Sequence, residues 1–252
     1  MPAIKLRYTL IFIVILISCL IWTAPAWLMA KLANTASNET IILENTSGRF
    51  LKGNATAINY RRDRNTIQRF ENISWHWVPT QLLKGNLAFR IIITDRQITA
   101  DGIMGAGFTG HAINEFHANI SAESIGNLFP EASTLSPRGD LDIKIPSLKI
   151  NPFKIEEPAS IHWKNAGVTI SNVSPLGDYM FNLTPQKDGI DVKLQTIKGP
   201  LRMNGNGSYN EKTGGRIDGE AQGGPELTPV LRLMGIPHDG KVDFVFTIPP
   251  LV

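Results

Sequence analysis

The sequence predicts a mainly β protein, in which a single N-terminal transmembrane helix precedes an antiparallel β-meander or sandwich-like domain with two short helices. Two observations carry this prediction. Residues 8–30 contain no charged side chain, and much of the remaining chain alternates apolar and polar residues with a period of two. We therefore expect residues 1–30 to form a cytoplasmic stub and membrane anchor, and residues 31–252 to form one exported β-rich domain.

The predicted anchor is an apolar helix long enough to cross a bilayer. Its 23 uncharged residues would extend about 34 Å as a helix, against a hydrocarbon core of about 30 Å. Lys5 and Arg7 precede this stretch, so the positive-inside rule keeps the N-terminus in the cytoplasm and exports the rest. The expected anchor residues are Leu10, Ile11, Phe12, Ile13, Val14, Ile15, Leu16, Ile17, Leu20, Ile21 and Trp22.

Two alternatives for the N-terminal segment stay open. Residues 24–26 read Ala-Pro-Ala, which resembles a signal-peptide cleavage site. Residues 16–19 loosely resemble a lipobox, in which Cys19 would become a lipidated N-terminus. We favour an uncleaved anchor, because apolar residues follow Cys19 directly and the uncharged stretch continues to Ala30.

The exported part is predicted to be an antiparallel meander. Residues 141–145 read Leu-Asp-Ile-Lys-Ile, which places three apolar side chains on one face and two charges on the other. The same alternation occurs in residues 73–77, 87–93, 179–183, 190–194 and 242–248. Glycine-containing turns are expected at residues 84–86, 138–140, 187–189, 213–215 and 238–240. Such alternation joined by short turns predicts strands with one solvated face.

Two short helices are expected to interrupt the strands and to pack as lids over an end of the sheet, with partner-binding helices as the alternative. The first is predicted to begin at Ser121 and to end before Pro130. For the second, Thr228 is the expected N-cap, Pro229 occupies the first turn, and Gly235 ends the helix. The apolar side of this second helix would carry Leu227, Leu231 and Met234.

No catalytic, cofactor or metal site is predicted. The histidines lack metal-ligand spacing, and His76 and His162 are expected to face outward on strands. Residues 105–110 match G-x-G-x-x-G, but no helix pattern follows them, so we interpret them as a glycine-rich β-turn. The single cysteine also excludes a disulfide scaffold. We therefore expect a non-enzymatic protein without cofactor or small-molecule substrate.

The charge balance argues against nucleic-acid binding and points to one basic stretch. The chain has 25 Lys and Arg against 22 Asp and Glu, and Lys5 and Arg7 account for two of the three net charges. Positive residues concentrate between Arg49 and Arg69. The candidate contacts to an acidic partner or to lipid headgroups are Arg61, Arg62, Arg64 and Arg69. The alternative interpretation is a solvated loop between strands.

The order of short segments along the chain resembles a known family. The segments are residues 47–55, 73–79, 82–87, 139–141, 162–166, 175–179, 199–207 and 227–235. Their order and spacing resemble protein N of the bacterial type II secretion system over nearly the whole chain. One departure is Leu51, which stands where the family often has tryptophan.

This resemblance implies a single-pass inner-membrane protein of Gram-negative bacteria, with the bulk of the chain in the periplasm. It also implies an accessory, non-enzymatic component of the secretion machinery, whose partners are other type II secretion components and inner-membrane lipid. An exposed strand edge is a hypothetical docking element. The alternative is a periplasmic lipid-handling protein, AsmA-like or similar to lipopolysaccharide-export proteins, in which Trp75, Trp77 and Trp163 line a groove of a curved sheet.

Overall fold

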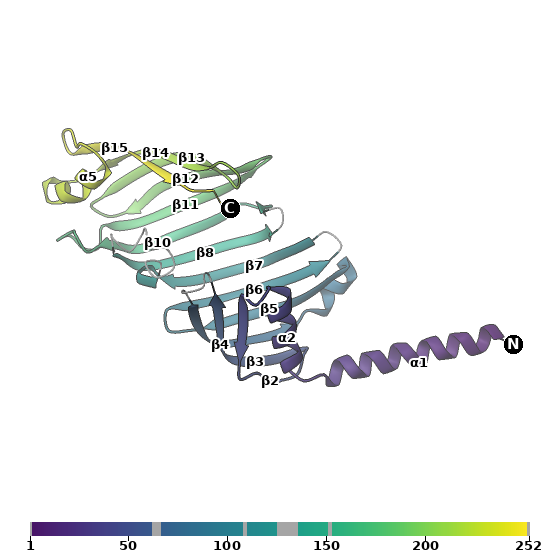
Figure 1. The fold of residues 1–252 in the computed structure, drawn as a ribbon. Coiled ribbons are helices and arrows are strands. Elements are labelled where there is room, and N and C mark those ends of the chain that lie inside the picture. Colours follow the sequence, from purple (N-terminus) through teal and green to yellow (C-terminus); the bar gives the residue numbers. More distant parts are fainter. Residues whose placement is uncertain (1, 62–66, 108–109, 125–135, 151–152, 251–252) are drawn as a thin grey trace. The chain divides into compact units, whose positions relative to one another are not determined.

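The computed structural model describes residues 2–61, 67–107, 110–124, 136–150 and 153–250. The chain divides into two compact units, Met1–Asp95 and Arg96–Val252. Each unit is built mainly from antiparallel strands (Figure 1). The mainly β prediction is therefore confirmed.

The smaller unit combines two helices with a short meander. Its strands pair antiparallel in the order β1-β3-β4-β5, and β2 pairs with β3. The predicted strands 73–77 and 87–93 lie in β4 and β5. The elements are α1 (Pro2–Thr23), α2 (Trp27–Ala36), β1 (Ile41–Glu44), β2 (Ser47–Gly48), β3 (Lys52–Arg61), β4 (Ile67–Trp77), the 3-10 helix η1 (Pro79–Lys84) and β5 (Asn86–Thr94).

The apolar N-terminal stretch forms two helices where the sequence suggested one. Helix α1 ends at Thr23, and α2 begins at Trp27. Pro25 lacks an N–H donor and lies between them, where it forms a β-bridge with Arg49. The N–H of Ala26 donates to the Gly48 carbonyl at 3.2 Å. The break between α1 and α2 therefore lies where residues 25 and 26 contact the chain at residues 48 and 49.

No helix within the described part of the chain meets the length and hydropathy expected of a membrane span.

The core of the smaller unit is centred on Trp75 in β4. This side chain is 3% exposed and packs with Ala26 and Ala55. Its indole Nε1 donates to the Phe50 carbonyl at 2.9 Å. A Cβ at Gly53 would lie 2.6 Å from the Trp75 ring and 2.7 Å from the Ser47 carbonyl oxygen. Only glycine therefore allows the chain to approach the tryptophan this closely.

The larger unit is a longer meander. Its strands pair in the order β6-β7-β8-β10-β11-β12-β13-β14-β15, all antiparallel, and β9 pairs with β8. The strands are β6 (Ile98–Gly107), β7 (Gly110–Ser121), β8 (Pro137–Lys149), β9 (Lys154–Ile155), β10 (Ala159–Val168), β11 (Gly177–Gln186), β12 (Gly189–Lys198), β13 (Arg202–Asn210), β14 (Gly214–Gln222) and β15 (Lys241–Ile248).

The meander prediction is confirmed in this unit, and the sandwich-like expectation is corrected. The predicted strands 141–145, 179–183, 190–194 and 242–248 lie in β8, β11, β12 and β15. Among the described residues, the strands of the unit pair in one continuous order instead of forming two stacked sheets. The physical reason is that short connections join consecutive strands, which keeps each strand hydrogen-bonded beside its predecessor.

One predicted turn is wrong. Residues 138–140 lie inside β8, whereas each of the other four predicted turns lies at the junction of two consecutive elements. Gly139 has φ of +101°, and a Cβ there would lie 2.3 Å from the Lys164 carbonyl oxygen. The pairing of β8 with β10 shifts register between Lys164 and Gly167. The glycine therefore serves a bulge and a close strand contact instead of a chain reversal.

The predicted C-terminal helix is confirmed as α5 (Thr228–Met234), which follows the 3-10 helix η2 (Pro225–Leu227). Its capping differs from the prediction. The N-cap is Leu227, and the Thr228 hydroxyl donates to the Pro225 carbonyl at 2.7 Å. Most of the other predicted helix, residues 125–130, lies outside the described residues. The glycine-rich segment behaves as predicted, since Gly107 pairs with Gly110 between β6 and β7.

A large apolar cluster forms the core of the larger unit. The largest fully buried side chains are Phe244, Leu201, Leu227 and Leu231. Helix α5 supplies Leu231, so it closes over the sheet as the sequence suggested. Tyr179 is also buried, and its hydroxyl donates to the Leu201 carbonyl at 3.0 Å. Burial raises the pKa of Tyr179 well above its ordinary value.

Candidate interaction surfaces

The candidate sites among the described residues are exposed surfaces and a cavity in the smaller unit. Among these residues, no group of three or more His, Cys, Asp or Glu side chains is placed to hold a metal ion. His162 lies in β10 opposite Asp142 of β8, and its Nε2 is buried and has no hydrogen-bond partner within the described structure. Trp77 has the same property at its indole Nε1.

The structure describes two of the four arginines predicted as contact residues, on the neighbouring strands β3 and β4. Arg61 is exposed at the end of β3, where its backbone N–H donates to the Thr40 carbonyl at 2.8 Å. Arg69 lies in β4, and its Nη1 is 2.7 Å from Oε2 of Glu44 in β1. Arg62 and Arg64 lie outside the described residues. One of the predicted cationic contacts is therefore charge-compensated within the unit.

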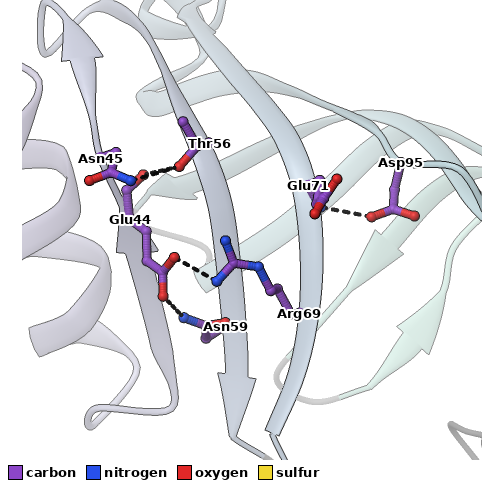
Figure 2. A network of polar contacts seen from close by, with 7 residues as sticks. All are labelled: Glu44, Asn45, Thr56, Asn59, Arg69, Glu71 and Asp95. Atoms are coloured by element: carbon purple, nitrogen blue, oxygen red, sulfur yellow. Dashed lines mark hydrogen bonds and ion pairs between the residues drawn. The ribbon is translucent and has the colours of Figure 1, made fainter.

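Glu44 is the centre of a polar network on strands β1, β3 and β4 (Figure 2). Its Oε1 accepts a hydrogen bond from Asn59 Nδ2 at 2.5 Å, and Oε2 accepts from Arg69. The hydrogen bond from Asn59, together with that from Arg69, lowers the pKa of the Glu44 carboxyl below its usual value. The network thus links three neighbouring strands through one carboxylate.

Two further contacts extend this polar surface (Figure 2). Asn45, the residue after β1, donates from its Nδ2 to Thr56 Oγ1 of β3 at 3.2 Å. The backbone N–H of Glu71 donates to Asp95 Oδ2 at 2.8 Å. These hydrogen bonds tie exposed positions together, which indicates a structural role for the polar side chains drawn there.

A cavity of about 930 Å³ lies in the smaller unit. Its polar lining comes from two cross-strand pairs of β3 and β4, in which Lys52 stands opposite His76 and Asn54 opposite Ser74. Further lining residues are Trp22 near the end of α1, Arg49, Leu51, Trp77 and Pro79. The described residues that line the cavity include no Asp or Glu.

The chain segment around this cavity is held at several points. The N–H of Arg49 donates to the Lys52 carbonyl at 2.8 Å, and the N–H of Lys52 donates back to Arg49 at 3.2 Å. The N–H of Trp77 donates to the Leu51 carbonyl at 2.7 Å, and Phe50 donates to the Ala24 carbonyl at 2.8 Å. The segment that presents both cations is therefore fixed to β4 on one side and to the end of α1 on the other.

Sequence reasoning placed Arg49 and Lys52 in the basic stretch but did not group them with Trp22, His76 and Trp77. The alternation in residues 73–77 puts Ser74 and His76 on the face opposite Trp75. That pattern could have identified one wall of the cavity. The other walls depend on the register between β3 and β4 and on the return of residues 24–26, which no local pattern encodes.

Strand β15 forms a free edge of the larger unit. It pairs with β14, and no other strand among the described residues pairs with it. Val245 is 51% exposed, Phe246 39% and Ile248 37%. Edge strands are usually short, charged or covered, because their unpaired N–H and C=O groups can pair with another chain. An unpaired strand of eight residues, three of which have exposed apolar side chains, is therefore a candidate docking element.

Acidic residues on β8 and β11 form ion pairs on the larger unit. Asp142 lies 2.8 Å from Lys164 Nζ, and this hydrogen bond lowers the pKa of Asp142. Asp178 accepts the Asn165 N–H at 2.8 Å and lies 3.3 Å from Lys198 Nζ. Burial by itself would raise the pKa of Asp178, but these two donors outweigh it, so the pKa lies below its ordinary value.

Comparison with known proteins identifies the family. The family model described as type II secretion system (T2SS), protein N, matches residues 41–246. No curated protein and no solved structure matches the chain. The matched range begins at β1 and ends within β15, so it contains nearly all of the strands described above. The chain therefore belongs to the type II secretion system protein N family.

Proposed function

We propose that this protein is a non-enzymatic accessory component of type II secretion, anchored in the inner membrane by α1, with a periplasmic β region that docks partner proteins. Family membership supports the secretion role. Support for the anchor comes from the exposed apolar side chains of α1, among which Phe12, Ile17 and Trp22 are 65%, 50% and 60% exposed. A helix that leaves such residues uncovered by protein gains stability in lipid.

The observation that carries the docking proposal is the free edge of β15. A strand of a partner can add to this edge, because main-chain hydrogen bonds provide affinity and alternate side chains provide selectivity. Val245 and Ile248 supply exposed apolar surface there, whereas Lys241 and Asp243 keep the first part of the strand charged. The partner is another component of the secretion machinery with an unpaired strand.

The lipid-handling alternative receives less support from the larger unit. A groove for an acyl chain requires uncovered apolar surface on the sheet. The apolar face formed by β12 to β15 instead buries Leu194, Ile217 and Phe244 against residues of the same chain. A filled core of this kind favours a docking domain over a lipid carrier.

The basic residues Arg61, Arg62, Arg64 and Arg69 remain proposed contacts for an acidic partner or for headgroups. Arg69 already pairs with Glu44. Among the described arginines of this group, we therefore propose the exposed Arg61 as the main contact for an acidic partner or for headgroups.

A matched pair of variants tests docking. Val245→Lys places a charge on the free edge, and Ile197→Lys is the control, because Ile197 is 49% exposed on β12, an inner strand paired on both sides. We expect Val245→Lys to reduce secretion of a type II substrate in cells that lack the native copy, and Ile197→Lys to leave it unchanged. Photo-crosslinking from position 245 should capture a secretion component. Equal secretion by both variants, or equal crosslinks from position 197, would refute docking at β15.

A further inference from the structure

We infer that the cavity of the smaller unit is a binding site for the headgroup of an anionic phospholipid. This inference rests on the proposed anchoring of α1, which brings the cavity to the membrane surface. The supporting observations are the cations of the cavity, its donor groups and the position of Trp22.

The charge of the cavity selects an anionic group. Arg49 and Lys52 are both exposed at its lining, and within the described structure neither forms an ion pair. The described lining residues include no carboxylate that would neutralise them. An arginine fork together with a lysine ammonium is the usual combination for binding phosphate oxygens.

The neutral groups of the cavity suit the same ligand. Asn54 and Ser74 form one cross-strand pair of the lining, and His76 stands opposite Lys52 in the next pair. These side chains offer hydrogen bonds to phosphate or to headgroup hydroxyls. Trp77 also lines the cavity, and its indole N–H is buried and unpartnered among the described residues. A volume of about 930 Å³ is at the upper end of the range of roughly 300–1,000 Å³ typical of ligand sites.

The position of Trp22 identifies the source of the ligand as the membrane. Trp22 lies in the last turn of α1 and also lines the cavity. Tryptophan at the end of a membrane helix prefers the level of the headgroups. A phospholipid beside α1 can therefore place its acyl chains along exposed Leu20 and Ile21 while its phosphate reaches Arg49 and Lys52.

The experiment compares phospholipid retention by the full chain purified in detergent, measured by native mass spectrometry. The probes are phosphatidylglycerol and phosphatidylcholine with identical acyl chains. The cavity variant is R49Q/K52Q. The matched control is K31Q/K84Q, which also removes two cations from exposed positions of the same unit, outside the described cavity lining.

We expect the wild type and the control to retain phosphatidylglycerol in preference to phosphatidylcholine. The cavity variant should need about tenfold more phosphatidylglycerol for half-saturation, because two cationic contacts are lost. Equal retention by the cavity variant and the wild type would overturn the inference. An equal loss in both double variants would also overturn it, since it would assign lipid retention to overall charge.

Alkaline extraction of membranes separates this inference from the proposed function. A wild-type protein released by carbonate would contradict anchoring by α1. If the wild-type protein stays in the membrane but the cavity and control variants retain phosphatidylglycerol equally, only the headgroup site is contradicted. Because Arg49 and Lys52 are exposed, circular dichroism should show the fold of the cavity variant unchanged.

Discussion

The larger unit buries large apolar side chains in one cluster, whereas the smaller unit buries mostly small ones around Trp75. In the larger unit, β12 to β15 and α5 supply aromatic and branched residues to the same interior. In the smaller unit, glycine and alanine let backbone segments approach one another, and hydrogen bonds link those segments. This difference leaves the smaller unit with a hollow surface beside fixed cations, and it leaves the larger unit with a filled interior and a free edge.

The largest expected effect is on the interior of the larger unit. Phe244 is 1% exposed, and Phe244→Ala should lower the free energy of unfolding of this unit by about 3–5 kcal/mol, because the cavity left by the ring is only partly refilled. Urea unfolding of the full chain in detergent would measure the loss, and hydrogen exchange would locate it. Val245→Ala on the exposed side of the same strand is the control and should change little.

The second effect concerns the smaller unit. Trp75→Phe keeps an aromatic ring but removes the Nε1 donor, so the Phe50 carbonyl loses its partner. We expect a loss of about 1–3 kcal/mol, the usual cost of an unsatisfied buried polar group. Hydrogen exchange in peptides from β3 and β4 would report it. If Trp75→Phe left exchange in those peptides unchanged, the smaller unit would not depend on main-chain links as we argue.

The third effect is a pH dependence in the larger unit. The pKa of Asp178 is lowered on folding, so its contribution to stability is complete above the pKa of the unfolded chain, about 4, and is lost as the pH falls through the folded value. Asp178→Asn should therefore be less stable than the wild type at pH 7, and the two stabilities should converge toward pH 3. Thermal unfolding at stepped pH would measure this. A difference that stays constant across that range would contradict the assignment.

The smallest effect is expected for the polar network of the smaller unit. Glu44→Gln removes the charge that pairs with Arg69, but Arg69 is half exposed and water replaces much of the interaction. We expect a barely measurable change in unfolding, which shrinks further at high salt. A strong destabilisation would show that the network in Figure 2 is a major support of the β1 to β4 strands.

The strands were predictable because the period of two is a local property. In β4, Ile73 and Trp75 share one face, and in β15 Val242 and Phe244 share one face. Each pair identifies a half-buried strand without knowledge of the neighbouring strands. Gly139 was misinterpreted because a glycine needed for a bulge looks the same in sequence as one needed for a turn.

The two proposed binding surfaces were less accessible to sequence reasoning. The free edge of β15 is a consequence of strand order, and the cavity combines residues from 22 to 79 through strand register. Helix α2 was missed because Trp27 to Ala30 continue the uncharged stretch, and Pro25 was interpreted as part of a possible cleavage site instead of a helix break. Long-range pairing, and not residue type, decides each of these features.

The bridge between Pro25 and Arg49 has a mechanical consequence. Residues 24–26 are hydrogen-bonded to the chain around β2. The connection between α1 and the strands of the smaller unit is therefore held by hydrogen bonds, unlike a flexible linker, and such a joint would be rigid. In a membrane-anchored protein such a joint restricts swivelling and tilting. The smaller unit would then stand on the bilayer in a restricted range of orientations, and a partner would meet it at a nearly constant height above the lipid.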